Sequence, residues 1–330
     1  MLVSCGKPQD QHATFYVFGT TVEVTIRDTD EDKASAAFFV LQQRFQAMHR
    51  EWHAWEPGHL TDINLAFSEG RKIAVKDDVA SLIRHSQTLE TASGGRFNAA
   101  IGGLIELWGF HTSDYPINGP PPEPEEIQSW LDKQASTLDI QIDGEQVSSR
   151  NPAVQLDFGG IAKGYAVDIA CNLLIELGVG NAIVNAGGDL RAYGGKTQPW
   201  NIAINKPGGG IIGGIKVYGD EAVFTSGSSH RFRQDGLQRY PHILDPRNGQ
   251  PISGLSATTV ITHDATVADV AATAIMVAGI NDWPAVASAL GLDTVLVVDE
   301  DGALFMTEQM KSRLSLKNNQ TAQITIVEIP

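Results

Sequence analysis

Two oxygen-bearing side chains, Asp269 and Thr273, are spaced so that they could act on one ligand. They stand four residues apart in a segment, 265–278, whose small and apolar residues predict a helix, so both face one side of it. A carboxylate and a hydroxyl offer the hard oxygen ligands that Mg²⁺ takes. An acidic residue near a helix N-terminus and a threonine that bonds back to its own helix explain the same pattern. The two residues taken alone favour this second explanation.

A second candidate is the stretch 156–166, Leu-Asp-Phe-Gly-Gly-Ile-Ala-Lys-Gly-Tyr-Ala, in which an apolar strand end leads through Gly159 and Gly160 into a helix. Paired glycines let a ligand approach the backbone, and free N–H groups at a helix start attract anions. Lys163 adds a mobile positive charge. The glycine spacing matches neither a dinucleotide fingerprint nor a Walker A loop. A turn that packs a helix on a sheet, with Lys163 in solvent, explains the stretch equally well.

His242 is the candidate general base, because histidine titrates near neutral pH. It lies in the segment Tyr-Pro-His-Ile-Leu-Asp-Pro, 240–246, whose two prolines and Asp245 restrict its geometry. The chain contains nine histidines, so a single one is more often structural.

Other residues are suited to a flat, polar ligand. Asp157 and Asp189 adjoin glycine turns, where they would either bind ribose or base edges or cap the turns. Trp55, Phe97 and Phe18 could stack on a planar ring, although aromatic side chains belong more often to the core.

The elements that must position these residues are strands and helices without regular alternation. The patterns predict a hairpin or bulged strand over 14–26 and helices over 31–51, 79–91, 124–134, 165–177, 265–278 and 285–290. Further strands are predicted at 138–142, 146–149, 181–194, 200–204, 214–217, 257–262, 294–298 and 303–306. This order favours an α+β fold with mixed or antiparallel sheets and packed helices.

Composition limits the partners. The 330 residues carry a net charge of −15, which argues against a nucleic-acid or anionic-membrane surface. An anionic ligand would therefore need a local cation or backbone dipoles. No run approaches the roughly 20 apolar residues of a membrane span.

The two cysteines have different surroundings. Cys171 lies on the apolar face of the helix predicted at 165–177 and is expected to be an inert core residue. Leu2-Val3-Ser4-Cys5-Gly6 has the form of a bacterial lipobox, in which the cysteine is lipidated. The charged and apolar regions of a signal peptide do not stand before it in this sequence, so either the signal peptide has been trimmed or the match arises by chance, and we favour the first. We therefore expect residues 1–13 to be a lipoprotein N-terminus and linker, and residues 14–330 to be the catalytic domain.

Taken together, the motifs resemble the ApbE family of FAD:protein FMN transferases. The resemblance runs from Phe15 to Met306 and rests on blocks in family order: Phe18-Gly19-Thr20-Thr21, 97–110, 156–166, Val-Asn-Ala-Gly-Gly-Asp at 184–189, Thr-Ser-Gly at 225–227 with His-Ile-Leu-Asp-Pro at 242–246, and 265–274. It implies an ApbE-like, T-fold-related architecture and transfer of FMN from FAD to a Thr or Ser hydroxyl of an acceptor flavoprotein, with release of AMP.

The resemblance also assigns residues. It implies that Gly160 (through its carbonyl), Asp269 and Thr273 bind Mg²⁺, and that His242 activates the acceptor hydroxyl. The FAD contacts that it implies are Phe18, Trp55, Arg96, Phe97, Asn98, Asp157, Lys163, Ile243 and Ala272. Two positions depart from the family pattern: Asn98 stands where an aspartate is expected, and Trp55 where tyrosine is frequent. The aromatic ring of Trp55 favours transfer over hydrolysis.

Three functions remain open at this stage. The first is FMN transfer to a subunit of a respiratory or redox complex, on the periplasmic side of a bacterial inner membrane to which Cys5 anchors the protein. The second is an FAD pyrophosphatase that yields FMN and AMP. The third is a lipoprotein that binds and stores FAD without chemistry. The presence of His242, Asp269 and Thr273 favours the two catalytic functions, because storage needs no base beside a metal.

Overall fold

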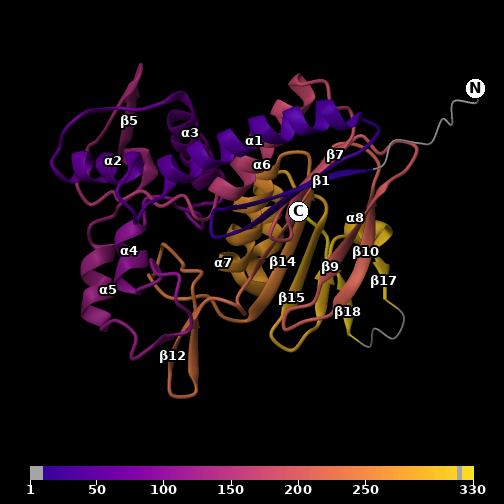
Figure 1. Cartoon of the computed structure of the whole chain (residues 1–330). Coiled ribbons are helices and arrows are strands. Elements are labelled where there is room, and N and C mark those ends of the chain that lie inside the picture. Colours follow the sequence, from indigo (N-terminus) through magenta and orange to yellow (C-terminus); the bar gives the residue numbers. More distant parts are fainter. Residues whose placement is uncertain (1–9, 318–321) are drawn as a thin grey trace, which may run out of the picture.

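The computed structural model describes residues 10–317 and 322–330 (Figure 1). Cys5, which the sequence predicts to carry the lipid, lies outside the described residues. The first strand, β1 (Gln11–Val17), begins within the stretch 1–13 that the sequence assigns to a linker.

A sheet of nine strands forms the centre of the molecule (Figure 1). Neighbouring strands are antiparallel, except that the last two pair in parallel. β1 pairs with β2 across the turn Phe18-Gly19, where both residues have positive φ, as a tight hairpin turn requires. In spatial order the strands are β1, β2 (Thr20–Ile26), β7 (Ala182–Ala186), β8 (Asp189–Tyr193), β11 (Glu221–Gly227), β14 (Leu255–Thr262), β15 (Val295–Asp299), β16 (Leu304–Met306) and β18 (Ile324–Ile326).

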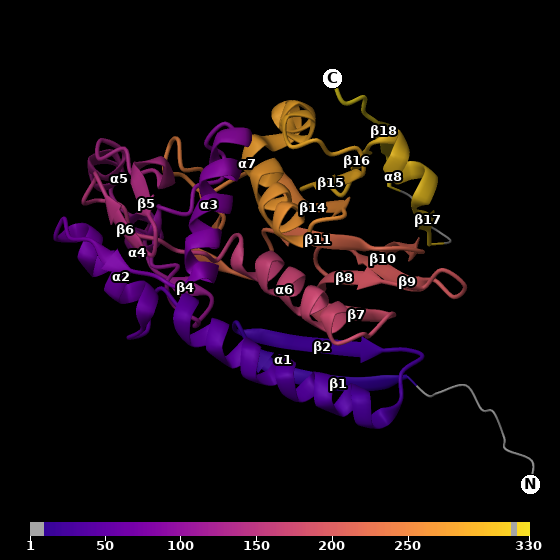
Figure 2. The same cartoon turned by 90° about the horizontal axis from the view of Figure 1, so that it is seen from above.

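Three helices pack on one face of this sheet (Figure 2). They are α1 (Glu31–Trp52), α6 (Ala162–Glu176) and α7 (Ala265–Ala289). The apolar stripe of α1, which includes Leu41, Phe45 and Met48, is fully buried, as its helical spacing predicts. This face holds the larger of the two cores.

The second core covers the opposite face of the sheet. There β9 (Trp200–Asn205), β10 (Ile211–Val217) and β17 (Ser315–Leu316) form a small sheet, and α8 (Glu308–Arg313) packs beside it. Because β15 is covered on both faces, Val295 and Val297 enter the first core while Leu296 and Val298 enter the second.

The remaining elements form a lobe at the left of Figure 1. Two three-stranded sheets lie within it. The lobe contains α2 (His59–Ser68), α3 (Asp77–Ala92), α4 (Gly102–Leu107), α5 (Pro124–Leu131), the 3₁₀ turn Thr137–Asp139, and the strands β3 (Ile73–Ala74), β4 (Ile117–Asn118), β5 (Ile140–Asp143), β6 (Gln146–Ser149), β12 (Phe232–Asp235) and β13 (Gln238–Pro241).

The structure confirms the α+β class and most of the predicted elements. Residues 155–158 are not a strand end: Gln155 makes a single bridge to Ile101, and the chain then turns directly into α6. The segments 265–278 and 285–290, predicted as two helices, lie in the element α7, which consists of two helices that meet at a non-helical break at Gly279, directly after the predicted end of the first. Gly279 has a positive φ of 72°, which glycine adopts without strain.

Among the described residues, α7 alone has the length and apolar composition of a membrane span, a feature that the sequence analysis did not anticipate. Its contacts with β11, β14 and α6, together with the break at Gly279, identify it as a core helix of the domain.

Gly164 allows α6 and α7 to approach closely. A Cβ atom at Gly164 would lie 2.2 Å from the Ala265 carbonyl oxygen and 2.8 Å from Asp269 Cβ. Both distances are too short for any side chain, so the absence of a Cβ sets the separation of the two helices.

We therefore predict that Gly164→Ala destabilises the fold by about 1–3 kcal/mol, the usual cost of overpacking a core. Gly180→Ala is the matched control, since its Cβ would meet nothing within 4 Å. The two free energies of unfolding, measured with urea, should differ by that amount. Equal values would show that the helices separate without cost.

Candidate active site

Lys163, in the first turn of α6, lies between two buried carboxylates. Its Nζ donates a hydrogen bond to Asp189 at the start of β8, and another, of 3.3 Å, to Asp269 Oδ1 on α7. The second oxygen of each carboxylate accepts a backbone N–H: Thr225 donates to Asp189 Oδ1 at 2.7 Å, and Gly164 donates to Asp269 Oδ2 at 2.9 Å. Four elements, α6, β8, β11 and α7, thus converge on one ammonium group.

The electrostatics of this cluster keep Lys163 charged, whereas they oppose the ionisation of Asp269. Burial alone would lower the pKa of Lys163, but the two carboxylates and their hydrogen bonds raise it above its ordinary value. Burial raises the pKa of Asp269 in spite of the Lys163 ammonium, and the nearby Asp189 carboxylate raises it further. The site therefore holds one more negative than positive charge when both carboxylates are ionised.

Hydroxyl groups continue the cluster along α7 and β11. Thr273 lies one helical turn after Asp269, as the sequence predicts, and its Oγ1 shares a hydrogen bond of 3.0 Å with Ser226 Oγ. The preceding residue of β11, Thr225, points to the opposite face of the sheet, where its Oγ1 lies 2.9 Å from Thr259 Oγ1 of β14. The sequence alone did not indicate these two partners.

The oxygen groups at this position are compatible with Mg²⁺. No cluster of three or more His, Cys, Asp and Glu side chains suited to a metal occurs in 10–317 and 322–330. A site made of one carboxylate, one hydroxyl and one carbonyl needs no such cluster. Asp269 Oδ1 already attracts a cation, the Lys163 ammonium, which supports the fit. Gly160 precedes α6, and a Cβ there would lie 3.4 Å from the Phe97 ring.

His242 follows directly after β13. Its Nδ1 lies 3.2 Å from the Arg231 carbonyl oxygen, which requires a proton on Nδ1 and leaves Nε2 free to accept one. Burial, followed by the positive charge of Arg231, lowers the pKa of His242 from 6.5 to about 4. The positive charge of the Lys163 ammonium also lowers the pKa of His242. His242 is thus a neutral base at physiological pH.

Asp157 connects the glycine turn to an aromatic group. Its Oδ1 accepts the Gly159 N–H at 2.7 Å, and its Oδ2 accepts the Trp55 indole N–H at 2.8 Å. The Trp55 ring lies 5.2 Å from the ring of His111. Asp157 therefore fixes the turn and orients Trp55, while its predicted contact with FAD remains a prediction.

The other predicted FAD contacts have varied surroundings. Phe97, Ile243 and Ala272 are buried, and Phe18 packs against Trp52 and Phe45 of α1. Their contact with FAD stays a prediction.

Arg96 and Asn98 are held by neighbouring groups of the protein. Arg96 pairs with Asp282 at 3.1 Å, while its buried Nε has no partner among the described residues. Asn98 donates to the Ala135 carbonyl at 2.9 Å and accepts the Ala100 N–H at 2.7 Å, so its amide holds the local chain.

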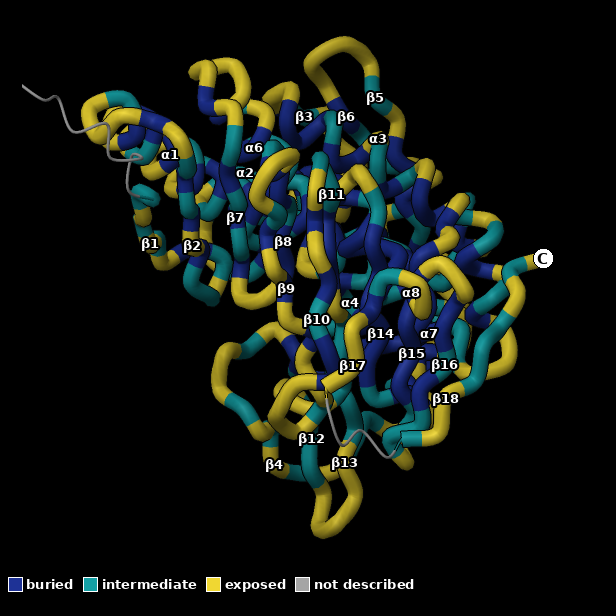
Figure 3. The backbone as a smooth tube through the Cα atoms, turned by 90° about the vertical axis from the view of Figure 1, so that its right-hand side faces the viewer, coloured by how far each residue is buried: buried dark blue, intermediate teal, exposed yellow. Residues whose placement is uncertain are grey.

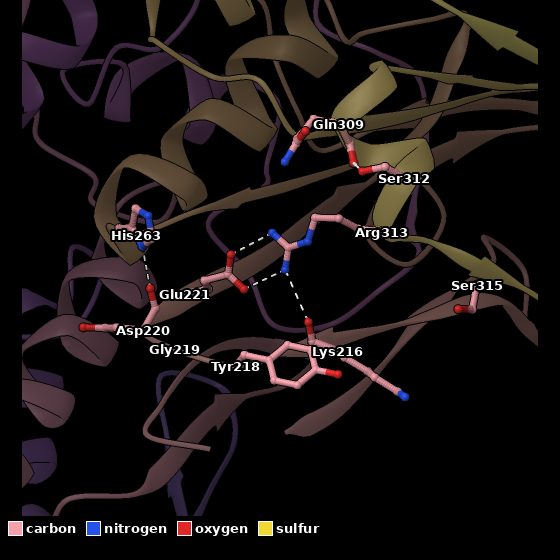
Figure 4. Close-up of a pocket in the computed structure, with 10 residues that line it drawn as sticks. All are labelled: Lys216, Tyr218, Gly219, Asp220, Glu221, His263, Gln309, Ser312, Arg313 and Ser315. Atoms are coloured by element: carbon pink, nitrogen blue, oxygen red, sulfur yellow. Dashed lines mark hydrogen bonds and ion pairs between the residues drawn. The ribbon is translucent and has the colours of Figure 1, made fainter. Parts of the chain in front are cut away.

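A cavity of about 600 Å³ lies apart from the Lys163 cluster, between β10, the start of β11 and α8 (Figure 4). Both of its carboxylates are paired: Arg313 donates to both oxygens of Glu221 at 2.7 and 2.6 Å, and Arg191, outside the lining, holds Asp220. Glu221 and Thr225 are four residues apart on β11, so the cavity lies about 13 Å from the lysine cluster. We assign the chemistry to the cluster of Lys163, Asp189 and Asp269, because it joins unlike charges to the hydroxyl-bearing side of α7 and its ammonium acts on the pKa of His242.

Comparison with known proteins gives a consistent result. The sequence model described as "ApbE family" matches residues 18–296. An FAD:protein FMN transferase of Rhodobacter capsulatus is 39% identical over 97% of this chain, which spans 62% of the length of that relative. An FAD:protein FMN transferase of Vibrio cholerae is 29% identical, and the match covers 91% of this chain and 91% of that relative.

Solved structures are also similar. The crystal structure of the ApbE protein of Thermotoga maritima superposes with a TM-score of 0.84 at 29% identity, covering 93% of this chain and all of that one. The apo flavinyl transferase ApbE of Pseudomonas stutzeri gives a TM-score of 0.82 at 26% identity, covering 96% of this chain and all of that one.

Proposed function

This chain belongs to the ApbE family, and from that premise we propose that it is an FAD:protein FMN transferase. The observation that supports the proposal is the cluster of Lys163 with the buried carboxylates of Asp189 and Asp269, which lies near enough to the neutral base His242 for the Lys163 ammonium to help lower the pKa of that histidine. The names of the relatives support flavin transfer as the activity.

In the proposed reaction, a Thr or Ser hydroxyl of the acceptor attacks the phosphorus on the FMN side of the FAD pyrophosphate. A new oxygen–phosphorus bond forms, the bond to the AMP phosphate breaks, and AMP leaves. The hydroxyl proton passes to His242 Nε2, which is free because Nδ1 faces the Arg231 carbonyl. The low pKa of His242 keeps this nitrogen unprotonated at neutral pH.

Asp269, Thr273 and the Gly160 carbonyl are the residues that we propose for Mg²⁺. When bound, this ion would neutralise pyrophosphate charge and act as a Lewis acid on it. Lys163 supplies a second positive charge beside the same anion. In a protein of net charge −15, such local cations offset the general repulsion of FAD.

We propose that aromatic and polar side chains outside the Lys163 cluster contact the FAD. Asp157, held by the Gly159 N–H, fixes Trp55 near the glycine turn, where its ring could stack on a flat ligand. Phe18, Arg96, Phe97, Asn98, Ile243 and Ala272 stay proposed contacts on the basis of the family resemblance.

We propose further that the acceptor is a flavoprotein subunit of a respiratory or redox complex and that the protein acts on the periplasmic side of the membrane through a lipid on Cys5. The support for the anchor is the lipobox pattern at Leu2–Gly6, which precedes the first strand, β1, that begins at Gln11.

The test is to incubate the protein with FAD and Mg²⁺, with and without a folded domain that carries a Ser/Thr-Gly-Ala/Ser-Thr type motif. AMP, free FMN and protein-bound flavin are then measured. AMP formed together with bound flavin, and abolished by a chelator, is the expected result. AMP with only free FMN would make the protein a pyrophosphatase, and intact bound FAD would make it a storage protein.

A further inference from the structure

The hairpin of β12 and β13 projects from the lobe and ends in an exposed tip (Figures 1 and 3). It is attached to the other strands through two residue pairs with β4. Leu237 at the tip is fully exposed, with a relative accessibility of 102%. An apolar side chain in such a position contributes nothing to the core, so its exposure has no explanation in the stability of this domain.

One face of the hairpin holds it on the body. Arg233 and Tyr240 are directly paired, so their side chains share a face. Arg233 donates to the Trp108 carbonyl at 3.1 and 2.8 Å, and the Tyr240 ring lies 5.7 Å from the Trp108 ring. A Cβ at Gly109 would lie 2.7 Å from Arg233, so the arginine fits tightly against α4.

The opposite face carries a different set of side chains. Because residues alternate along a strand, Phe232, Gln234, Arg239 and Pro241 share the face away from Trp108. The Arg239 guanidinium lies 4.7 Å from the centre of the Phe232 ring, a cation–π contact that holds both side chains in place. This face, with Leu237 at its tip, forms a preordered surface of apolar and cationic groups.

The hairpin is joined directly to the proposed base. His242 follows Pro241, and its backbone N–H donates to the Arg231 carbonyl at 3.0 Å, just before β12. Leu237 precedes His242 by five residues of extended chain, about 17 Å. A standard protein interface buries about 800 Å² per partner, which as a circular patch has a radius of about 16 Å. An acceptor that presents a hydroxyl to His242 would therefore cover most of the hairpin and reach the vicinity of its tip.

The charge of the hairpin indicates the chemistry of its partner. Residues 231–241 contain three arginines and one aspartate, in a chain of net charge −15. Arg233 is engaged with the body, whereas Arg231 and Arg239 are exposed. This local positive surface is complementary to an acidic one.

We propose that the outer face of the β12–β13 hairpin, with Leu237 and Arg239 as its principal residues, docks the acceptor protein through an acidic and apolar surface beside the acceptor hydroxyl. This inference rests on the proposed transferase function. In the hydrolysis of FAD, water replaces the acceptor hydroxyl and needs no docking surface. Loss of acceptor docking should therefore leave FAD hydrolysis intact.

The experiment compares Leu237→Asp and Arg239→Glu with the wild type, using the same motif-bearing domain as acceptor. We expect the KM for the acceptor to rise about tenfold in each variant, because the substitution places like charges at the interface. The kcat at saturating acceptor and the slow FAD hydrolysis without acceptor should stay within about twofold of the wild type, since neither residue is expected to touch FAD. Ile211→Asp, at another exposed apolar residue in the separate β9–β10–β17 sheet, is the matched control.

The outcomes separate the two proposals. An unchanged KM in both variants would overturn the docking surface, and so would an equal loss of FAD hydrolysis, which would assign these residues to the FAD site. A wild type that never modifies the domain, yet cleaves or stores FAD, would instead overturn the transferase. If Leu237→Asp converts a dimer into a monomer in sedimentation with KM unchanged, the surface binds a second copy of this chain and the proposal is wrong.

Discussion

His242→Asn is expected to lower FMN transfer by about a hundredfold to ten-thousandfold, the usual contribution of a general base. The side chain remains able to donate to the Arg231 carbonyl, so the loss should fall on kcat while FAD binding persists. Transfer is measured as AMP released and flavin bound to the acceptor. His230→Asn is the matched control, because His230 is an exposed histidine just before β12, whereas His242 directly follows β13.

The same variant reports on pH. The folded protein holds the pKa of His242 near 4, below the ordinary 6.5, so between these values the unfolded chain binds a proton that the folded one does not. His242 therefore costs stability progressively as the pH falls through this window and costs none above it. The free energy of unfolding of the wild type, relative to His242→Asn, should decline from pH 7 to pH 4. A constant difference would mean that His242 is not shielded.

The second large effect is expected for Asp269→Asn. The amide oxygen can still accept the Gly164 N–H, but the charge that attracts a cation is lost. Removing partners of metal ligands typically costs ten- to a hundredfold in affinity, so loss of a ligand should cost about a hundredfold or more. Binding of Mn²⁺ as a probe, followed by calorimetry, measures this directly, and FAD cleavage should fall with it.

Asp282→Asn serves as the control for that experiment. Asp282 lies on the same helix, α7, and pairs with Arg96 near the surface. If both variants bind Mn²⁺ as the wild type does, Asp269 is no metal ligand, and its role is confined to the ion pair with Lys163.

The elements could be predicted where local spacing decides the structure. The stripe of Leu41, Phe45 and Met48 defines α1, and the four-residue interval between Asp269 and Thr273 places both on one face of α7. The β12–β13 hairpin was missed because its residues are polar, although the pair Asp235-Gly236 is a typical turn signal that could have revealed it. The break at Gly279 agrees with the predicted end of the first helix at Ala278, whereas the second helical segment of α7 begins earlier than the predicted residue 285.

The partners within the site could not be predicted, because they are set by the register of distant strands. Asp189 was recognised as an acidic residue at a glycine turn, but its ion pair with Lys163 depends on how β8 lies beside α6. The bond from Trp55 to Asp157 joins residues 102 positions apart. The Ser226 hydroxyl was not recognised, because its bond to Thr273 depends on how β11 lies beside α7.

The same long-range assembly has a consequence during biosynthesis. Lys163 and Asp269 lie 106 positions apart, and Thr225 of β11 completes the Asp189 carboxylate between them. A nascent chain that ends before α7 therefore has the glycine turn and the lysine but lacks the carboxylate that we propose for the metal. Because non-local antiparallel pairing is slow, FAD affinity should arise late, after the C-terminal half has folded. Flavin capture would then mark completed molecules and leave truncated ones without ligand.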